Sequence, residues 1–251
     1  MGTVSMTGVS KVYGGAHGVH ALDNVDVHLA EGEFMALLGP SGCGKSTLLN
    51  MLAGFEGQTE GAISFDGRSV VKPGPDRGVV FQEAALLPWL TVWQNVVFGP
   101  QVQGVPRADY EPRAKEILRV VGLDAFHDAL PAQLSGGMRQ RVGIARALVM
   151  QPRALLMDEP FGALDAQTRL SMQQLLLEVW QRFKTTVLFV THDIDEAILL
   201  ADRVCIMTAR PGRITRDIPI TLPRPRTIDD LLSPAFVAFK AQIMSEMRGA
   251  H

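Results

Sequence analysis

The sequence is poor in the features that mark secreted and membrane-spanning proteins. Among its 251 residues it has only two cysteines, Cys43 and Cys205, so no disulfide framework is expected and a reducing compartment fits. No apolar run approaches the roughly 18 residues that a membrane-spanning helix needs. The amino-terminal segment has no apolar core of signal-peptide length. We therefore expect a soluble chain, whose role at a membrane would need a partner that supplies the spans.

The sequence also has no strong excess of acidic or of basic residues. The net charge of −2 at pH 7 gives no global basic field, so no nucleic-acid partner is expected. Internal repeats and low-complexity segments are also absent. The composition, with 47% hydrophobic and 20% charged residues, is that of a globular protein with enough apolar material for a real core.

The stretch from Phe34 to Leu52 combines an apolar run, a glycine-rich loop and an apolar helical pattern. It satisfies G-x-x-x-x-G-K-[ST] through Gly39, Gly44, Lys45 and Ser46. Glycines let successive backbone N–H groups point into one concavity, and the helix that follows adds its N–H groups and its dipole. Lys45 can neutralise β/γ-phosphate charge, and the Ser46 hydroxyl can ligate Mg²⁺. The stretch predicts a nucleoside-triphosphate site, lined by Gly39, Pro40, Ser41, Gly42, Cys43, Gly44, Lys45, Ser46 and Thr47.

The rest of the chain alternates strand and helix patterns, which predicts an α/β fold. Strands are expected at 3–10, 24–30, 61–66, 78–82, 154–157, 186–190 and 203–207. Helices are clearest at 114–121, 138–150 and 170–183. The whole stretch 84–150 has a helical pattern, which indicates an insertion between two halves of the nucleotide-binding sheet. After Ile206 the pattern weakens, until Ser233 and Pro234 provide an N-cap and a first-turn proline for a last helix.

Polar residues stand at the carboxyl ends of three predicted strands, where open α/β sheets bind ligands. They are Gln82, the pair Asp158 and Glu159, and His192. Behind a phosphate loop, Asp158 is expected to hold Mg²⁺ and Glu159 to orient or deprotonate an attacking water. A solvated acidic turn and a purely structural histidine are the alternatives.

Three further side chains need comment, and two of them carry two interpretations each. Tyr13 precedes a glycine-rich turn at 14–18 and is either a half-buried strand aromatic or a ring on which a base stacks. Cys43 lies beside Lys45 at a helix start, a setting that lowers a thiol pKa, so we expect a reactive thiol that MgATP protects. The alternative is a thiol that faces the sheet. Cys205, in an apolar strand, is expected to be buried and inert.

An apolar stripe marks the last helix. It consists of Phe236, Phe239, Ile243 and Met247. The stripe either packs on its own domain or makes a dimer or regulatory contact.

The segment Leu134-Ser135-Gly136-Gly137-Met138-Arg139-Gln140-Arg141 adds a second glycine motif. Together with the phosphate loop, Gln82, Asp158-Glu159, Ala163-Leu164-Asp165 and His192, it resembles the ATP-binding subunit of ABC transporters. The resemblance covers residues 4–214 in order, residue type and spacing. It implies a P-loop core with a small antiparallel β subdomain and an inserted helical subdomain at about 84–150. The cassette would span 1–215, followed by an extension with a helix at 216–251.

The same resemblance implies roles for single residues. Ser135, Gly136 and Gly137 would be the signature, whose N–H groups at a helix start form a second anion site. A second copy of the subunit would bring that site to the γ-phosphate, so that two subunits sandwich two ATPs head to tail. Tyr13 would stack on the base, and Asp165 would lie in a loop that crosses between protomers. Mg²⁺ would be held by Ser46, Gln82 and Asp158. Catalysis would use Glu159, His192 as a switch and Gln82 as a γ-phosphate sensor facing the permease. Met138 departs from the glutamine most frequent in the family.

A finer resemblance concerns the transported solute. The segments 77–82, Leu87-Pro88-Trp89 and Pro211-Gly212-Arg213 are similar to the importer branch for taurine, other sulfonates and nitrate. That branch uses a periplasmic binding protein and two membrane permease chains, which implies a peripheral subunit at the cytoplasmic face of the bacterial inner membrane. Trp89 and Trp93 would be core aromatics of the helical insertion or would line a groove for a permease helix.

Other classes of P-loop protein fit less well. An ABC exporter ATPase remains open, because the neighbouring permease decides it. A soluble ABC ATPase acting on DNA or ribosomes would carry a long coiled coil or a second cassette, and neither is present. A GTPase would carry N-K-x-D, which is absent, and Glu159 after Asp158 suits hydrolysis better than the phosphoryl transfer of a kinase.

Overall fold

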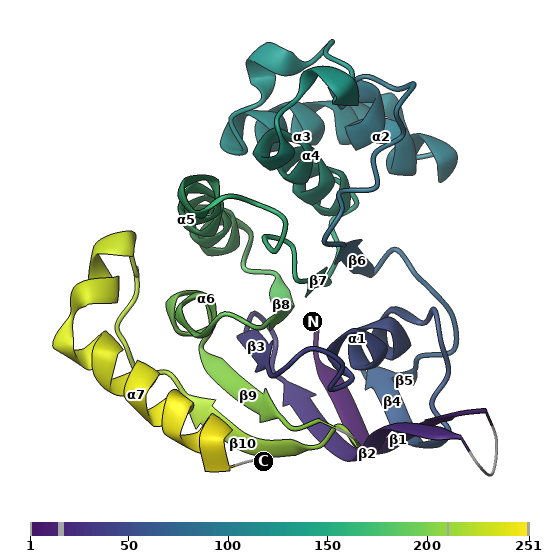
Figure 1. Cartoon of the computed structure of the whole chain (residues 1–251). Coiled ribbons are helices and arrows are strands. Elements are labelled where there is room, and N and C mark those ends of the chain that lie inside the picture. The colour runs from purple at the N-terminus through teal and green to yellow at the C-terminus, as the bar shows by residue number, and fades with distance from the viewer. Residues whose placement is uncertain (1, 15–17, 210, 250–251) are drawn as a thin grey trace. The chain divides into compact units, whose positions relative to one another are not determined.

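The computed structural model describes residues 2–14, 18–209 and 211–249. The chain has the predicted α/β architecture and divides into two compact units (Figure 1). The first unit consists of Met1–Gly74 and Lys184–His251, and the second of Pro75–Phe183. Among the described residues, no helix has the length and apolar character to cross a bilayer.

An antiparallel sheet forms one part of the first unit. Its strands are β1 (Val4–Tyr13), β2 (Val19–Leu29), β4 (Glu60–Phe65) and β5 (Arg68–Ser69), in the order β2-β1-β4-β5. Alternation explains its burial, because Val4, Met6 and other apolar residues of β1 face the core while their neighbours are more exposed.

The other part of the first unit is built around β3 (Phe34–Leu38). This strand pairs in parallel with β8 (Thr186–Thr191) and β9 (Arg203–Met207), and β10 (Ile214–Pro219) adds to β9 in antiparallel orientation. All five residues of β3 are buried, as expected of a strand covered on both faces. The helices of the unit are α1 (Lys45–Ala53), α6 (Ile194–Leu200) and α7 (Pro234–Gly249), with a 3₁₀ turn, η4 (Ile228–Leu232), before α7.

The second unit pairs two parallel strands, β6 (Arg77–Val80) and β7 (Ala154–Asp158). Its helices are α2 (Val92–Val102), α3 (Arg107–Val120), α4 (Gly136–Leu148) and α5 (Ala166–Phe183). Short 3₁₀ turns, η2 (Asp124–Phe126) and η3 (Pro131–Gln133), connect α3 to α4.

Two predicted patterns were wrong in detail. The helical pattern begins at Val92 rather than Ala84, because the buried Asn95 amide bonds the backbone of Leu87 and Leu90 and holds the segment before α2 in irregular form. The strand β10 was missed, because its alternation is weak and it is defined by its pairing with β9.

Candidate functional site

The glycine loop between β3 and α1 forms a concavity of backbone groups in the first unit. Gly42 and Gly44 have φ angles of 77° and 95°, which residues with a side chain rarely adopt. A Cβ on Gly44 would also lie 2.6 Å from Leu22 Cδ2. Ser41, Gly42 and Ser46 are exposed, so the loop and the start of α1, with its unpaired N–H groups, are accessible to a phosphate. The predicted helix start at Lys45 is confirmed.

Lys45 lies inside this loop with its side chain directed back over it. The residue is only 4% exposed, and Nζ donates to the carbonyl oxygens of Gly39 at 2.8 Å and Pro40 at 3.1 Å. The ammonium group therefore lies within the loop where a bound phosphate would need a counter-charge. Ser46, on the next residue of the helix, offers an exposed hydroxyl of the kind Mg²⁺ accepts.

The expectation of a reactive Cys43 is wrong. The residue is fully buried, and its Sγ lies only 2.9 Å from where a Cβ on Gly39 would stand. The thiol is packed inside the fold, so the alternative interpretation holds. Cys205 is buried as predicted, and burial raises the pKa of its thiol to about 12.

Gly212 touches the phosphate loop, a contact between distant segments that no sequence pattern predicts. A Cβ on Gly212 would stand 2.1 Å from the carbonyl oxygen of Cys43, which leaves no room for any side chain. Two backbone hydrogen bonds fix this approach, from Gly212 N to Ala21 O at 2.9 Å and from Asp23 N to Gly212 O at 3.0 Å. The segment before β10 is thus bonded to β2 and packs against the backbone of the phosphate loop, which it supports.

Tyr13 ends β1 with a ring that is 41% exposed. Its hydroxyl donates to Glu56 Oε2 at 2.7 Å, and Lys11 Nζ lies 2.9 Å from Glu56 Oε1 and 4.9 Å from the ring centroid. Burial raises the pKa of the Tyr13 hydroxyl, and the bond to Glu56 raises it further. The ring is held in place yet accessible, which suits stacking. Residues 15–17 of the predicted glycine-rich turn lie outside the described residues.

His192 follows β8 at the same edge of the sheet as the phosphate loop. The register pairs Leu38 with Thr191, so His192 and Gly39 leave the sheet side by side. His192 is exposed, while the turn beneath it is hydrogen-bonded. Asp193 N donates to Thr191 Oγ1 at 3.0 Å, and Thr191 Oγ1 donates to the buried Glu196 carboxylate at 2.6 Å. The predicted position at the carboxyl end of a buried strand is confirmed.

Gln82, Asp158 and Glu159 gather at one edge of the β6–β7 pair in the second unit. Val80 pairs with Met157, so the residues that follow emerge together. The Gln82 amide Nε2 lies 3.1 Å from where a Cβ on Gly162 would stand, which places it against the turn after Glu159. Glu159 has a positive φ of 44°, an uncommon conformation that clusters at functional sites.

Ser135 caps helix α4, as predicted. Its Oγ accepts from Met138 N at 3.2 Å, and the following glycines open the helix. A Cβ on Gly137 would stand 2.6 Å from Thr168 Cγ2, so close approach of α5 requires glycine there. Asp165 begins α5 in the same way: its carboxylate accepts from Thr168 N at 3.0 Å, and the hydrogen bonds from Thr168 lower its pKa.

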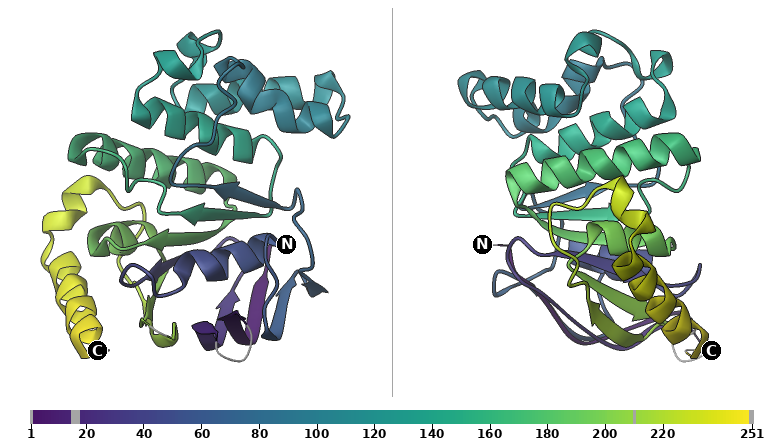
Figure 2. Two further views of the ribbon diagram at one scale, coloured as in Figure 1. Left: turned by 45° about the vertical axis from the view of Figure 1, so that its right-hand side comes forward. Right: turned by 90° about the vertical axis from the view of Figure 1, so that its left-hand side faces the viewer.

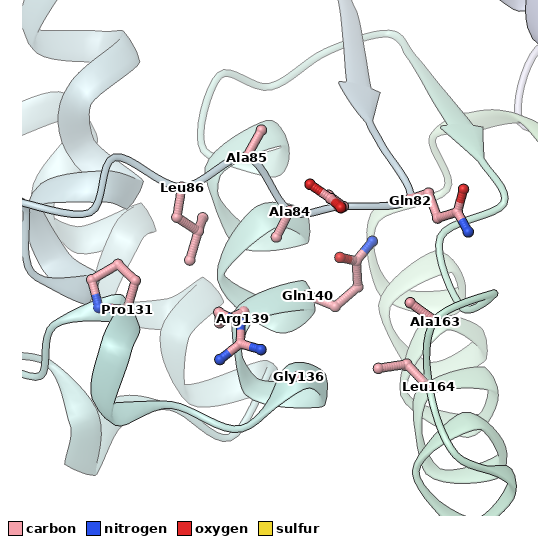
Figure 3. A pocket seen from close by; sticks show the side chains of 11 residues that line it. Gln82, Ala84, Ala85, Leu86, Pro131, Gly136, Arg139, Gln140, Ala163 and Leu164 are labelled. Carbon is pink, nitrogen blue, oxygen red and sulfur yellow. The ribbon is translucent and has the colours of Figure 1, made fainter.

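A cavity of about 480 Å³ lies between three segments of the second unit (Figure 3). Its walls are the segment after β6, the start of α4 and the turn before α5, which contribute Gln82, Arg139, Gln140 and Leu164 among others. Gln140 Nε2 donates to Phe81 O at 2.9 Å and so connects helix α4 to the segment that carries Gln82.

The burial of the two tryptophans and of the last helix decides between the interpretations that the sequence left open. Trp89 is 71% exposed, which excludes a core role for it. Trp93 is half-buried and stacks on His127, with ring centroids 4.9 Å apart. In α7, Phe236 and Ile243 are fully buried, so the stripe packs within its own unit. Ser233 caps this helix as predicted, accepting from Phe236 N at 3.2 Å.

Comparisons with known proteins agree with these features. The family model described as ABC transporter matches residues 22–162. The nitrate import ATP-binding protein NrtD of Synechocystis is 46% identical, covering 98% of this chain and 95% of the relative. The taurine import ATP-binding protein TauB of Rhizobium johnstonii is 56% identical, covering 78% and 75%. A dimeric ATP-binding cassette solved in a post-hydrolysis state with ADP and Pi superposes with a TM-score of 0.73 at 35% identity, covering 88% of this chain and 100% of that one. The chain belongs to the ABC transporter family, as one of its ATP-binding subunits.

Proposed function

We propose that the chain hydrolyses ATP to drive the import of a small anion such as taurine, another sulfonate or nitrate. The observation that carries the solute class is the 46% identity to a nitrate import ATP-binding protein along 98% of the chain. The relative for taurine supports the same branch at 56% identity. In this proposal two permease chains provide the membrane path, a binding protein delivers the solute, and the subunit lies at the cytoplasmic face of the membrane.

ATP would be held in the first unit by the phosphate loop. Backbone N–H groups of residues 39–47 would receive the phosphates, Lys45 would neutralise their charge, and the Tyr13 ring would stack on the base. Mg²⁺ would be held by Ser46, Gln82 and Asp158, whose hydroxyl, amide and carboxylate oxygens are the hard ligands it prefers. When bound, Mg²⁺ neutralises charge on the phosphate oxygens.

Hydrolysis would depend on three side chains of this chain. Glu159 would orient and deprotonate the attacking water, and its unusual backbone angle is consistent with a position fixed for function. His192 would donate a hydrogen bond toward the γ-phosphate from the turn after β8. Gln82 would report the presence of that phosphate to the segment that faces the permease, where the exposed Trp89 lies seven residues further on.

A second copy of the chain would complete each site. The helix start at Ser135, Gly136 and Gly137, where Ser135 and Gly136 are exposed and Gly137 is buried, carries the unpaired N–H groups that suit an anion, and we assign it to the ATP held by the partner. Asp165 would lie in the loop that crosses between the two copies. The cassette would comprise 1–215, with a helical subdomain at about 84–150 and an extension at 216–251.

The test is reconstitution of the chain with its permease chains and binding protein in liposomes. Taurine, a longer sulfonate and nitrate are supplied in turn, with a neutral sugar as the control solute. The proposal expects one anion to stimulate ATP hydrolysis and to accumulate inside. Stimulation by the sugar alone, or export of the anion, would contradict it.

A further inference from the structure

The carboxyl-terminal extension packs on the short helix that follows His192. Helix α6 has seven residues and begins two residues after His192. A helix this short has little stability of its own and takes its position from its neighbours. Helix α7 packs beside it in the first unit (Figures 1 and 2), and the 3₁₀ turn η4 contacts it as well. What holds α6 therefore also holds the turn that carries His192.

Two arginines of the extension bind the carboxyl end of α6. Arg226 is only 3% exposed, and its Nη1 donates to the carbonyl oxygens of Ile198 at 2.8 Å and Ala201 at 2.6 Å. Arg224 Nη2 donates to Leu200 O at 2.6 Å. These carbonyls belong to the last turn of the helix, where a cation also complements the dipole. Burial lowers the pKa of Arg226 to about 10, which leaves it charged at neutral pH.

The remaining two nitrogens of Arg226 bind the extension itself, with Nε donating to Leu222 O at 3.3 Å. Its Nη2 donates to Ile220 O at 2.9 Å and Leu222 O at 3.1 Å, both in the segment that leads from β10 toward α7. One buried guanidinium thus joins the extension to the end of α6 through backbone groups on both sides. No apolar residue could replace it without leaving these carbonyls unpaired.

The amino end of α6 is tied to α7 by an ion pair. Lys240 Nζ lies 2.8 Å from Asp195 Oδ2, in the first turn of α6. That turn is bonded to the His192 segment, because Glu196 N donates to Asp193 Oδ1 at 3.0 Å and Thr191 Oγ1 donates to the Glu196 carboxylate. A continuous series of bonds therefore connects α7 to the residues on either side of His192.

We infer that the carboxyl-terminal extension is a positioning element of the hydrolytic site, in which Lys240 and Arg226 hold α6 and, through it, His192. The inference rests on the proposed function, which gives His192 its role at the γ-phosphate. The bonds of Lys240 and Arg226 go to α6, to Ala201 just after it and to the extension itself. Loss of the contacts between the extension and α6 should therefore lower kcat and leave the KM for ATP unchanged.

The chain supplies a matched control for the ion pair. Glu246, on the same helix α7, pairs with Arg216 of β10 at 2.7 Å. Glu246 and Lys240 are similarly exposed, so neutralising either removes one surface ion pair from α7. Of these two ion pairs, the one between Lys240 and Asp195 connects α7 to α6, and the one between Glu246 and Arg216 does not.

The experiment measures ATP hydrolysis by the full-length chain carrying Lys240→Gln, Asp195→Asn or both. We expect kcat to fall about two- to fivefold, the factor that an exposed ion pair spans. The double variant should lose no more than either single one, because both remove the same contact. Lys240→Arg should retain kcat, and Glu246→Gln should behave as the wild type.

Two results would overturn the inference: wild-type kcat in Lys240→Gln, or an equal loss in Glu246→Gln. His192→Ala separates this inference from the proposed function. If His192→Ala keeps full kcat, the role of His192 is wrong; if it is inactive while Lys240→Gln is normal, only the positioning inference fails. Arg226→Met is less informative, since loss of the buried guanidinium also threatens folding, and the Lys240 variants keep the test decisive.

Discussion

Replacing Gly212 by alanine tests how closely the segment before β10 braces the phosphate loop. The new Cβ would stand 2.1 Å from the Cys43 carbonyl oxygen, 3.0 Å from Ala21 O and 3.0 Å from Leu22 Cδ2. Carbon–oxygen contacts are comfortable only from about 3.3 Å, so the loop and the segment must separate by more than roughly 1 Å. The backbone of Gly212 needs no special φ, and the effect therefore isolates the close approach.

The size of the effect follows from overpacking. Forcing one methyl group into a filled site costs about 1–3 kcal/mol of free energy of unfolding. If that strain falls on the nucleotide-bound loop, ATP affinity drops about ten- to a hundredfold. The assay is binding of ATP by calorimetry, with thermal unfolding measured beside it.

Gly57→Ala is the control for this substitution. A Cβ on Gly57 meets no atom within 4 Å, so we expect ATP affinity and unfolding temperature to match the wild type. Wild-type ATP affinity in Gly212→Ala, with no loss of stability, would refute the idea that this segment supports the loop.

Three further predictions follow from the sites. Glu159→Gln should bind MgATP but hydrolyse it about 10²–10⁴-fold more slowly and accumulate as an ATP-bound dimer, and near-normal turnover would remove its role. Gly137→Ala should lower the free energy of unfolding by about 1–3 kcal/mol, since its Cβ would meet Thr168 at 2.6 Å, whereas Gly136→Ala, with 3.5 Å to the nearest atom, should not. Neither thiol should react with a maleimide in native protein at pH 7.5, because Cys43 is fully buried and burial raises the pKa of Cys205 to about 12, and rapid labelling of Cys43 by peptide mapping would contradict this.

The local parts of the fold were predictable because local physics decides them. The helix start at Lys45, the N-caps at Ser135 and Ser233 and the buried strand before His192 are each encoded within a few neighbouring residues. Close approaches between distant segments were not predictable. The sequence near Cys43 says nothing of Gly212, and so neither the burial of the thiol nor the brace behind the loop could be anticipated.

The contacts of the carboxyl-terminal extension were not predictable from the sequence either. Arg226 stands in a proline-containing segment with no strong pattern, and its charge suggests solvent exposure. Only the fold brings it between the end of α6 and the extension, where five backbone oxygens accept from one guanidinium.

We propose that each ATP is sandwiched between the phosphate loop of one copy and the signature of the other, and mixing two inactive variants tests this arrangement directly. Ser135→Arg and Lys45→Ala subunits are mixed in equal amounts and their ATP hydrolysis is compared with each variant alone. We expect each variant alone to be inactive and their mixture to recover about a quarter of the wild-type rate, since half of randomly paired dimers are mixed and each holds one intact composite site. No recovery on mixing, or loss of ATP binding by dilute Ser135→Arg monomer, would contradict it.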